Sequence, residues 1–246
     1  MTTPGAIRVG TAGWAVPTPW ADRFPPGPSH LARYAQVLPA AEINTSFYRD
    51  HRPATYARWA GSVPDDFRFA VKVPRRFTHD ARLVVEPAEI HAWLTGPLEL
   101  GDRLGPLLVQ LPPSQRFEEG PARRFLTVLR VRLPGALVCE PRHATWFGDG
   151  ATRLLDELRV ARVAADPAPV PEGAEPGAWP EPGYWRLHGS PRMYYSPYDA
   201  AALEAAAVRL RSHAAAGHDA WCIFDNTAEF HATHDALAVQ ALLQAD

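Results

Sequence analysis

The stretch Tyr184-Trp-Arg-Leu-His-Gly189 decides the fold of this chain. Its apolar residues predict a buried strand, in which Arg186 and His188 lie two residues apart and share one face. Trp185 and Leu187 share the opposite face. If the bulky apolar pair packs against helices, the polar pair must point into the interior of a sheet. Burying ionisable groups there is costly unless they are paired or meet water, so the strand predicts a polar site inside the fold.

Eight apolar runs of this kind occur along the chain, and each contains or ends at a polar residue. They are residues 7–10 into Thr11, 40–43 around Glu42 and into Asn44, 67–71 into Lys72, 107–109 into Gln110, 136–139 into Glu140, 160–165 into Asp166, 184–187 around Arg186, and 220–224 into Asp225 and Asn226. Such runs are typical of buried parallel strands, and in a (β/α)8 barrel the carboxyl ends of the strands carry the site. We therefore predict an α/β fold, a TIM-like (β/α)8 barrel formed by a single domain over residues 1–246.

Helices are expected between the strands. They are residues 29–38 with Ser29 as N-cap, a helix from Pro53, residues 87–100, 121–131 and 151–158, a helix capped by Asp199 and reaching His213, and a last helix capped by Asp235. The sixth position differs, because residues 167–183 are too rich in proline and glycine for a helix. This Pro/Gly-rich segment is either a surface loop that replaces the sixth helix or a flap whose Trp179 touches a ligand.

The composition limits the classes of protein that the chain can represent. With 246 residues the length fits one barrel, and 46% hydrophobic with 21% charged residues is ordinary for a globular protein. A net charge of −2 argues against a surface broadly adapted to nucleic acid, although a local basic mouth stays compatible with it. Without a signal peptide or an apolar run near 18 residues, we expect a cytoplasmic protein that does not enter a membrane. Cys139 and Cys222 are expected to be free, buried thiols. The sequence does not indicate an oligomeric state.

Strand parity groups the candidate site residues at the carboxyl ends of the strands. It pairs Arg186 with His188, Glu42 with Asn44, and Glu140 with Arg142. The expected catalytic residues are Lys72, Glu140, Asp166 and His188. The expected substrate-binding residues are Trp14, Glu42, Asn44, Tyr48, His79, Arg142, His143, Trp146, Arg186 and Asn226. Cationic groups outnumber carboxylates in this set, which suits a phosphate or carboxylate ligand. The alternative is a ring of salt bridges that satisfy one another and close the top of the barrel.

A divalent metal is a further possibility at this site. Glu140, Asp166 and His188 are ligand types that manganese, zinc or magnesium accept, although no HExxH or paired CxxC motif is present. The chain also contains no GxGxxG or Walker A motif, so a nucleotide cofactor is not expected.

Several dense motifs give the chain a resemblance to a known family over nearly its whole length. They are Gly10-Thr-Ala-Gly-Trp14, Glu42-Ile-Asn-Thr-Ser-Phe-Tyr48, Phe69-Ala-Val-Lys-Val-Pro-Arg-Arg-Phe-Thr-His79, Leu108-Val-Gln-Leu-Pro-Pro113, Glu140-Pro-Arg-His-Ala-Thr-Trp-Phe147 and Tyr184-Trp-Arg-Leu-His-Gly189. In these motifs the chain resembles the YecE-like family, also called domain of unknown function 72, and the resemblance implies a TIM-like barrel. Phe224-Asp-Asn-Thr227 and Ala232-Thr-His-Asp-Ala236 depart from the family's usual Phe-Asn-Asn-Asp and Ala-x-x-Asn-Ala.

Three functions follow as hypotheses. The family's barrel is similar to those of metal-dependent apurinic endonucleases and sugar isomerases. The first hypothesis is therefore metal-assisted phosphodiester hydrolysis on nucleic acid, with Trp14, Tyr48 and Trp146 stacking the bases of single-stranded or distorted DNA. The second is a metal-free isomerase or lyase on a sugar phosphate, with Glu140 or Asp166 as base and Lys72 or His188 as acid. The third is a non-catalytic binding protein for an anionic metabolite.

Overall fold

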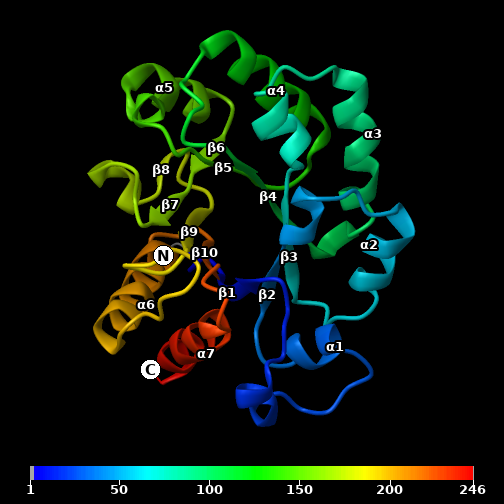
Figure 1. The fold of residues 1–246 in the computed structure, drawn as a ribbon, viewed down its shortest axis with the longest axis vertical. Helices are drawn as coiled ribbons and strands as arrows, with labels where there is room; N and C mark the ends of the chain where they lie inside the picture. The colour runs from blue at the N-terminus through cyan, green and yellow to red at the C-terminus, as the bar shows by residue number, and fades with distance from the viewer. Residues whose placement is uncertain (1–2, 246) are drawn as a thin grey trace.

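The computed structural model describes residues 3–245. It has a mixed α/β architecture built around one sheet. The sheet is nearly closed on itself, and the helices lie around its outer side (Figure 1). Its strands are β1 (Ile7–Ala12), β2 (Ala40–Ile43), β3 (Arg68–Lys72), β4 (Leu104–Gln110), β5 (Leu137–Glu140), β6 (Val160–Arg162), β7 (Ala164–Asp166), β8 (Gly177–Ala178), β9 (Gly183–Leu187) and β10 (Ala220–Phe224). Strands β1 to β6 pair in chain order, and β10 joins β9 to β1, all in parallel.

The described sheet has ten strands where eight were expected, because the sixth apolar run forms two strands and the segment after it adds β8. That run divides at Val163, because β6 pairs with β5 whereas β7 pairs with β9. The short strand β8 pairs antiparallel with β6 and takes the edge that would otherwise face β9. The interruption therefore coincides with the pairing of β6 to β8, which belongs to the segment 167–183.

The observed helices are α1 (His30–Tyr34), α2 (Pro53–Ala60), α3 (Pro87–Leu98), α4 (Glu119–Arg132), α5 (Asp149–Glu157), α6 (Ala200–Ala215) and α7 (His231–Gln244). Two expected caps are confirmed, since Ser29 accepts a hydrogen bond from the backbone of Ala32 and Asp199 accepts one from that of Ala202. The expected cap at Asp235 is wrong. Helix α7 begins four residues earlier, and the buried Asp235 carboxylate binds other groups.

Segment 167–183 contains no α-helix, as expected. It forms a 3-10 turn at Pro171–Ala174 and then β8. The guanidinium of Arg159 lies 5.5 Å from the Trp179 ring. Because Arg159 immediately precedes β6, this contact places Trp179 at the amino end of the sheet. Trp179 is therefore remote from the polar carboxyl ends of the strands.

Two apolar clusters pack on the two faces of the sheet. The inner cluster comprises Ala40, Ala70, Leu108, Val138, Ala161, Val163, Tyr184, Trp221 and Ile223. The outer cluster lies between strands and helices and includes Trp185 and Leu187, as parity predicts. The interior is therefore filled by side chains up to the level where the polar residues begin.

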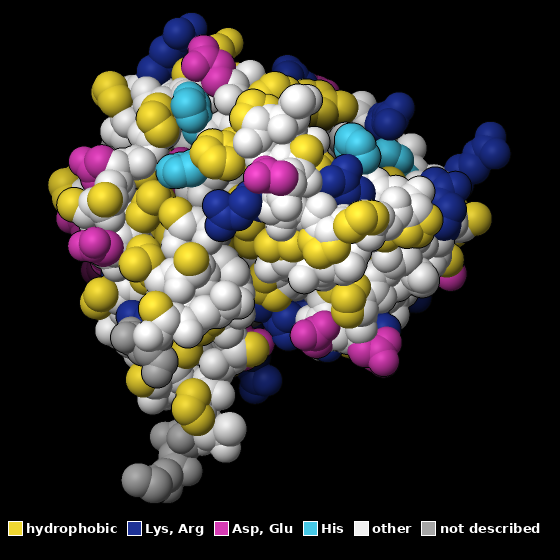
Figure 2. Space-filling view, turned by 90° about the horizontal axis from the view of Figure 1, so that it is seen from below, with side chains coloured by type: hydrophobic (Ala, Val, Ile, Leu, Met, Phe, Trp, Pro, Cys, Tyr) yellow, Lys and Arg dark blue, Asp and Glu magenta, His cyan; other side chains and the backbone are white. Residues whose placement is uncertain are grey.

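The outer surface is mixed in charge on the face shown in Figure 2, where acidic and basic side chains are interspersed among apolar ones. No helix in residues 3–245 is both long and apolar enough to cross a membrane.

Candidate functional site

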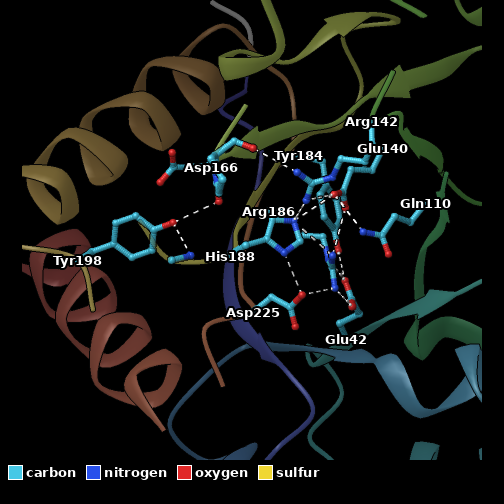
Figure 3. A network of polar contacts seen from close by, with 12 residues as sticks. Glu42, Gln110, Glu140, Arg142, Asp166, Tyr184, Arg186, His188, Tyr198 and Asp225 are labelled. Carbon is cyan, nitrogen blue, oxygen red and sulfur yellow. Dashed lines mark hydrogen bonds and ion pairs between the residues drawn. The ribbon is translucent and has the colours of Figure 1, made fainter. Parts of the chain in front are cut away.

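Arg186 lies at the centre of a buried polar network at the carboxyl ends of the strands (Figure 3). Its Nε and Nη2 donate to the two carboxylate oxygens of Glu42 at 2.9 and 2.8 Å. Its Nη1 donates to Glu140 at 3.2 Å, and Nη2 lies 2.9 Å from an oxygen of Asp225. Burial opposes the charge, but Asp225, Glu42 and Glu140 together hold the pKa of Arg186 well above its ordinary value. Arg186 is therefore a fixed, fully paired cation.

His188 connects two of the same carboxylates. Its Nδ1 is 3.0 Å from Asp225 Oδ2, and its Nε2 is 3.0 Å from Glu140 Oε1. Arg142 also contacts this point, with Nη2 2.6 Å from Glu140 Oε1 and directly against His188 Nε2. Because each ring nitrogen faces a carboxylate, the imidazole of His188 is held in one orientation. The network thus contains a positioned histidine.

The carboxylates of the network are held in their ionised form. Burial by itself would raise the pKa of Glu140, but Arg142, His188 and Arg186 keep this pKa well below its ordinary value. Burial likewise opposes ionisation of Asp225, and Arg186 and His188 lower the pKa of that carboxyl. Both groups therefore stabilise positive charge around them.

Lys72 ends β3 beside this network and is 5% exposed. It is the single lysine among the 25 lysine and arginine residues of the chain. Its Nζ lies 4.2 Å from the ring centroid of Phe47, and within residues 3–245 it makes no hydrogen bond or ion pair. Burial, followed by the charge of Arg186, lowers the pKa of Lys72 to about 8. An amine of this kind exists in both protonation states near neutral pH.

A cavity of about 410 Å³ opens between the ends of β1 and β2. It is lined by Ala12, Gly13, Trp14, Ala15, His30, Glu42, Ile43, Asn44, Thr45 and Tyr48. Among residues 3–245, none makes a hydrogen bond to the buried side-chain oxygen of Asn44, and the Tyr48 side chain is 73% exposed. The cavity is therefore bordered by an unused acceptor and by aromatic surfaces, next to the buried network.

Parity brings together most of the expected residues but not Asp166. Glu42, Lys72, Glu140, Arg142, Arg186 and His188 all join or adjoin the network. Asp166 pairs in register with Leu187, on the outer face, whereas Ala165 pairs with Arg186. Its carboxylate consequently points away from the network (Figure 3). The interruption at Val163 fixes this register, and the catalytic role expected of Asp166 loses its geometric basis.

The expected metal ligands do not converge as arranged. Glu140 and His188 face one another at hydrogen-bond distance, and Asp166 points elsewhere. No group of three or more His, Cys, Asp or Glu residues in the described part of the chain is placed to hold a metal ion. In this structure Glu140, Asp166 and His188 are therefore not arranged around one point.

Two expected substrate contacts are wrong, because both side chains are enclosed. Trp146 is 1% exposed, and its Nε1 donates to the backbone oxygen of Gln115. Asn226 is completely buried, and its amide donates to the backbone oxygen of Ser196 and to Asp235. Trp146 is thus part of the core, and Asn226 holds the loop that follows β9.

The two remaining histidines lie at strand ends, with different surroundings. His79 packs edge-on against Phe47, and burial followed by the charge of Lys72 lowers its pKa. His79 therefore belongs to the mouth of the site. His143 accepts a hydrogen bond from the backbone of Thr145 and caps the short turn after β5. Its position suits a structural role as well as a binding role.

Sequence reasoning did not assign four residues that the structure places here. Asp225 and Gln110 were recognised only as strand ends, and Tyr184 shares its face with Arg186, so parity was the available signal. Tyr194 had no such signal, since it lies in a loop. Its ring meets that of His188 edge-on at 5.7 Å, and its side chain is 41% exposed at the mouth.

Fold and site together define an α/β protein whose barrel-like sheet carries a buried ionic network and a lysine at the carboxyl ends of its strands. The chain belongs to the family described as protein of unknown function DUF72, whose model matches residues 8–246. It is 32% identical over 172 residues to the UPF0759 protein YecE of Escherichia coli K12 and 31% identical to that of strain O157:H7. The match covers 67% of this chain and 60% of the length of each relative.

Solved structures share the fold. A DUF72 family protein from Enterococcus faecalis V583 superposes with a TM-score of 0.78 at 19% identity, over 98% of this chain and 96% of that one. A DUF72 family protein from Thermotoga maritima MSB8 gives a TM-score of 0.74 at 21% identity, over 97% and 99% of the two chains. At these identities the similarity concerns the fold alone.

Proposed function

We propose that this protein is a metal-free isomerase or lyase acting on a sugar phosphate, with Lys72 at the centre of its chemistry. The observation that carries the proposal is the unpaired, buried amine of Lys72 beside the Arg186 network. Isomerisation and retro-aldol cleavage both require protons to move near a carbonyl group, and a group whose pKa lies near the working pH serves best. Lys72 is such a group.

Each part of the site has a role in this proposal. The sugar hydroxyls occupy the cavity, where the Asn44 oxygen accepts a hydrogen bond and Trp14 packs against the ring. The phosphate lies at the mouth, near Arg142 and His79. His188 Nε2 exchanges a proton with the substrate, while Glu140, held by Arg186, stays ionised and supports the imidazole.

The test is a panel of pentose, hexose and triose phosphates incubated with purified protein and followed by proton and phosphorus NMR, with and without chelator. Turnover that persists in chelator and disappears in Lys72→Met supports the proposal. The matched control is Arg75→Met, which removes an exposed cation close to the same strand end. Turnover that needs added metal, or that survives in Lys72→Met, contradicts it.

Metal-assisted hydrolysis of single-stranded or distorted DNA is the second candidate. It is favoured by the exposed Tyr48 and by Trp14, which line one cavity and could stack a base. Cleavage assays on single-stranded, duplex and abasic DNA with manganese, zinc, magnesium or chelator separate it from the first. Metal-dependent cleavage that is lost in Glu140→Gln favours the nuclease, and binding of a sugar phosphate without turnover favours a binding protein.

We also propose a finer description of the fold. In it, β6 and β7 are two halves of one strand, which makes the sheet an interrupted TIM-like (β/α)8 barrel. The free, buried thiols of Cys139 and Cys222 fit a cytoplasmic location.

A further inference from the structure

We propose that Lys72 acts covalently, its Nζ forming an imine with the carbonyl carbon of an aldose or ketose phosphate bound at the carboxyl ends of the strands, beside the cavity. This inference rests on the proposed function and specifies its chemistry. It assigns to the lysine a nucleophilic role in addition to proton transfer.

The first support is the choice of residue. The chain uses arginine for every cationic side chain except Lys72. A guanidinium is always protonated in proteins, whereas a buried amine can lose its proton and become a nucleophile. If position 72 needed only a positive charge, arginine would supply it, as it does at Arg142 and Arg186 in the same site. The amine is what distinguishes this position.

The second support is the surroundings of Nζ. The ring of Phe47 lies beneath it, and no described residue forms an ion pair or hydrogen bond with it. A buried amine without a direct partner favours its neutral form, and a nearby cation favours it further. The charged and titratable groups that act on it are Arg186 on β9, Glu42 on β2, Glu140 on β5, Asp225 after β10, and His79 after β3.

Burial and then the charge of Arg186 lower the pKa of Lys72 from 10.5 to about 8, although Glu42, Asp225 and Glu140 act to raise it. The backbone is held as well, because the Ser46 hydroxyl lies 2.6 Å from the carbonyl oxygens of both Lys72 and Ile43 and bridges the two strand ends. The amine is therefore both reactive and positioned.

The covalent step balances without an added oxidant or reductant. The lone pair of neutral Nζ forms a bond to the carbonyl carbon, and the C=O π electrons move to oxygen. The two hydrogens of the amine leave with that oxygen as water, and the C=N double bond forms. His188 and Glu140 provide a route for the proton that must reach the departing oxygen. Hydrolysis of the imine by water reverses the step and frees the product.

The experiment traps the imine with sodium borohydride, which delivers hydride to the imine carbon. Full-length protein is incubated with dihydroxyacetone phosphate or glyceraldehyde 3-phosphate at about pH 7.5, reduced, digested and mapped by mass spectrometry. The expected product is a reduced adduct on the peptide containing Lys72. At this pH a lysine of ordinary pKa has about two-hundredfold less neutral amine, so an exposed lysine should be labelled about two-hundredfold more slowly.

A surface lysine provides the matched control. The variant Arg124→Lys adds an exposed amine on α4, and its adduct should stay near background while Lys72 is labelled. Lys72→Arg should lose the adduct and keep the far-ultraviolet circular dichroism of the parent chain. Equal labelling of positions 72 and 124, or no adduct on Lys72, overturns the inference. Chelator-resistant turnover without a Lys72 adduct leaves the proposed function standing and refutes only the covalent step.

Discussion

Replacing Lys72 with methionine should stabilise the protein while removing its activity. The unfolded chain holds this amine at an ordinary pKa of 10.5, whereas burial lowers the pKa in the folded protein to about 8. Below pH 8 the amine is protonated in both states, and the folded protein carries the full cost of burying the charge. The difference corresponds to about 3 kcal/mol at about pH 7. Methionine fills a similar volume without a charge to bury.

The stabilisation by Lys72→Met should decrease as the pH rises. Between pH 8 and 10.5 the unfolded state binds more protons than the folded state, so the stability of the parent protein rises with pH. At about pH 9.5 the cost of the charge should have fallen to about 1.4 kcal/mol. The stabilising effect of Lys72→Met should therefore shrink to about half between the two pH values.

Urea denaturation and thermal unfolding at the two pH values measure this effect. At neutral pH we expect Tm to rise by about 6–12 °C in Lys72→Met, using about 2–4 °C per kcal/mol for a chain of this size. Lys72→Arg keeps its charge throughout and should be less stable than the parent at both pH values. A Lys72→Met protein that is less stable than the parent at neutral pH, or equally stabilised at both values, would refute the reasoning.

Three further substitutions test the network and the sheet. Glu42→Ala leaves Arg186 without its bidentate partner and should lower the unfolding free energy by about 3–5 kcal/mol in urea titration; a loss near zero would contradict a fixed ion pair. Asp235→Ala removes the acceptor that holds the loop after β9 and should cost about 1–3 kcal/mol, with faster proteolysis of residues 189–198; unchanged protection would argue against this anchoring. Gly10→Ala would place its Cβ 2.0 Å from the carbonyl oxygen of Ala40 in β2 and should prevent soluble folding. Gly120→Ala would meet only the flexible end of the Arg124 side chain, at 3.5 Å, and should be tolerated. A soluble, stable Gly10→Ala protein would contradict the close approach of β1 and β2.

The sequence predicted much of the sheet because a buried strand requires apolar residues on both faces. The run at residues 184–187 therefore identified β9, and alternation correctly sent Arg186 and His188 inward and Trp185 outward. An N-cap side chain binds a backbone N–H group only three residues further along the chain. Ser29 and Asp199 could therefore be recognised as N-caps from the sequence.

Errors arose where the outcome depended on contacts between distant segments. Asp166 ends an apolar run, but that run is divided at Val163, where β8 pairs with its first half. The register of β7 against β9 then turns the Asp166 carboxylate outward. Trp146 follows a strand as Trp14 does, yet it packs against Phe117 in the core while Trp14 lines the cavity. A sequence states what each residue is, whereas exposure depends on what the rest of the chain places over it.

The sequence by itself determined which groups would meet, because the period of a strand and the parallel arrangement bring strand ends to one edge. It also determined that one amine would lie among guanidiniums, since position 72 holds the single lysine. Only the tertiary structure decided how charge is distributed among them. Ion pairing depends on distances of about 3 Å between residues far apart in the chain. Such distances neutralise Arg186, and they leave Lys72 without an ion pair to any residue of the range 3–245. The mouth that the sequence predicted to be cationic is a balanced network beside an amine of lowered pKa.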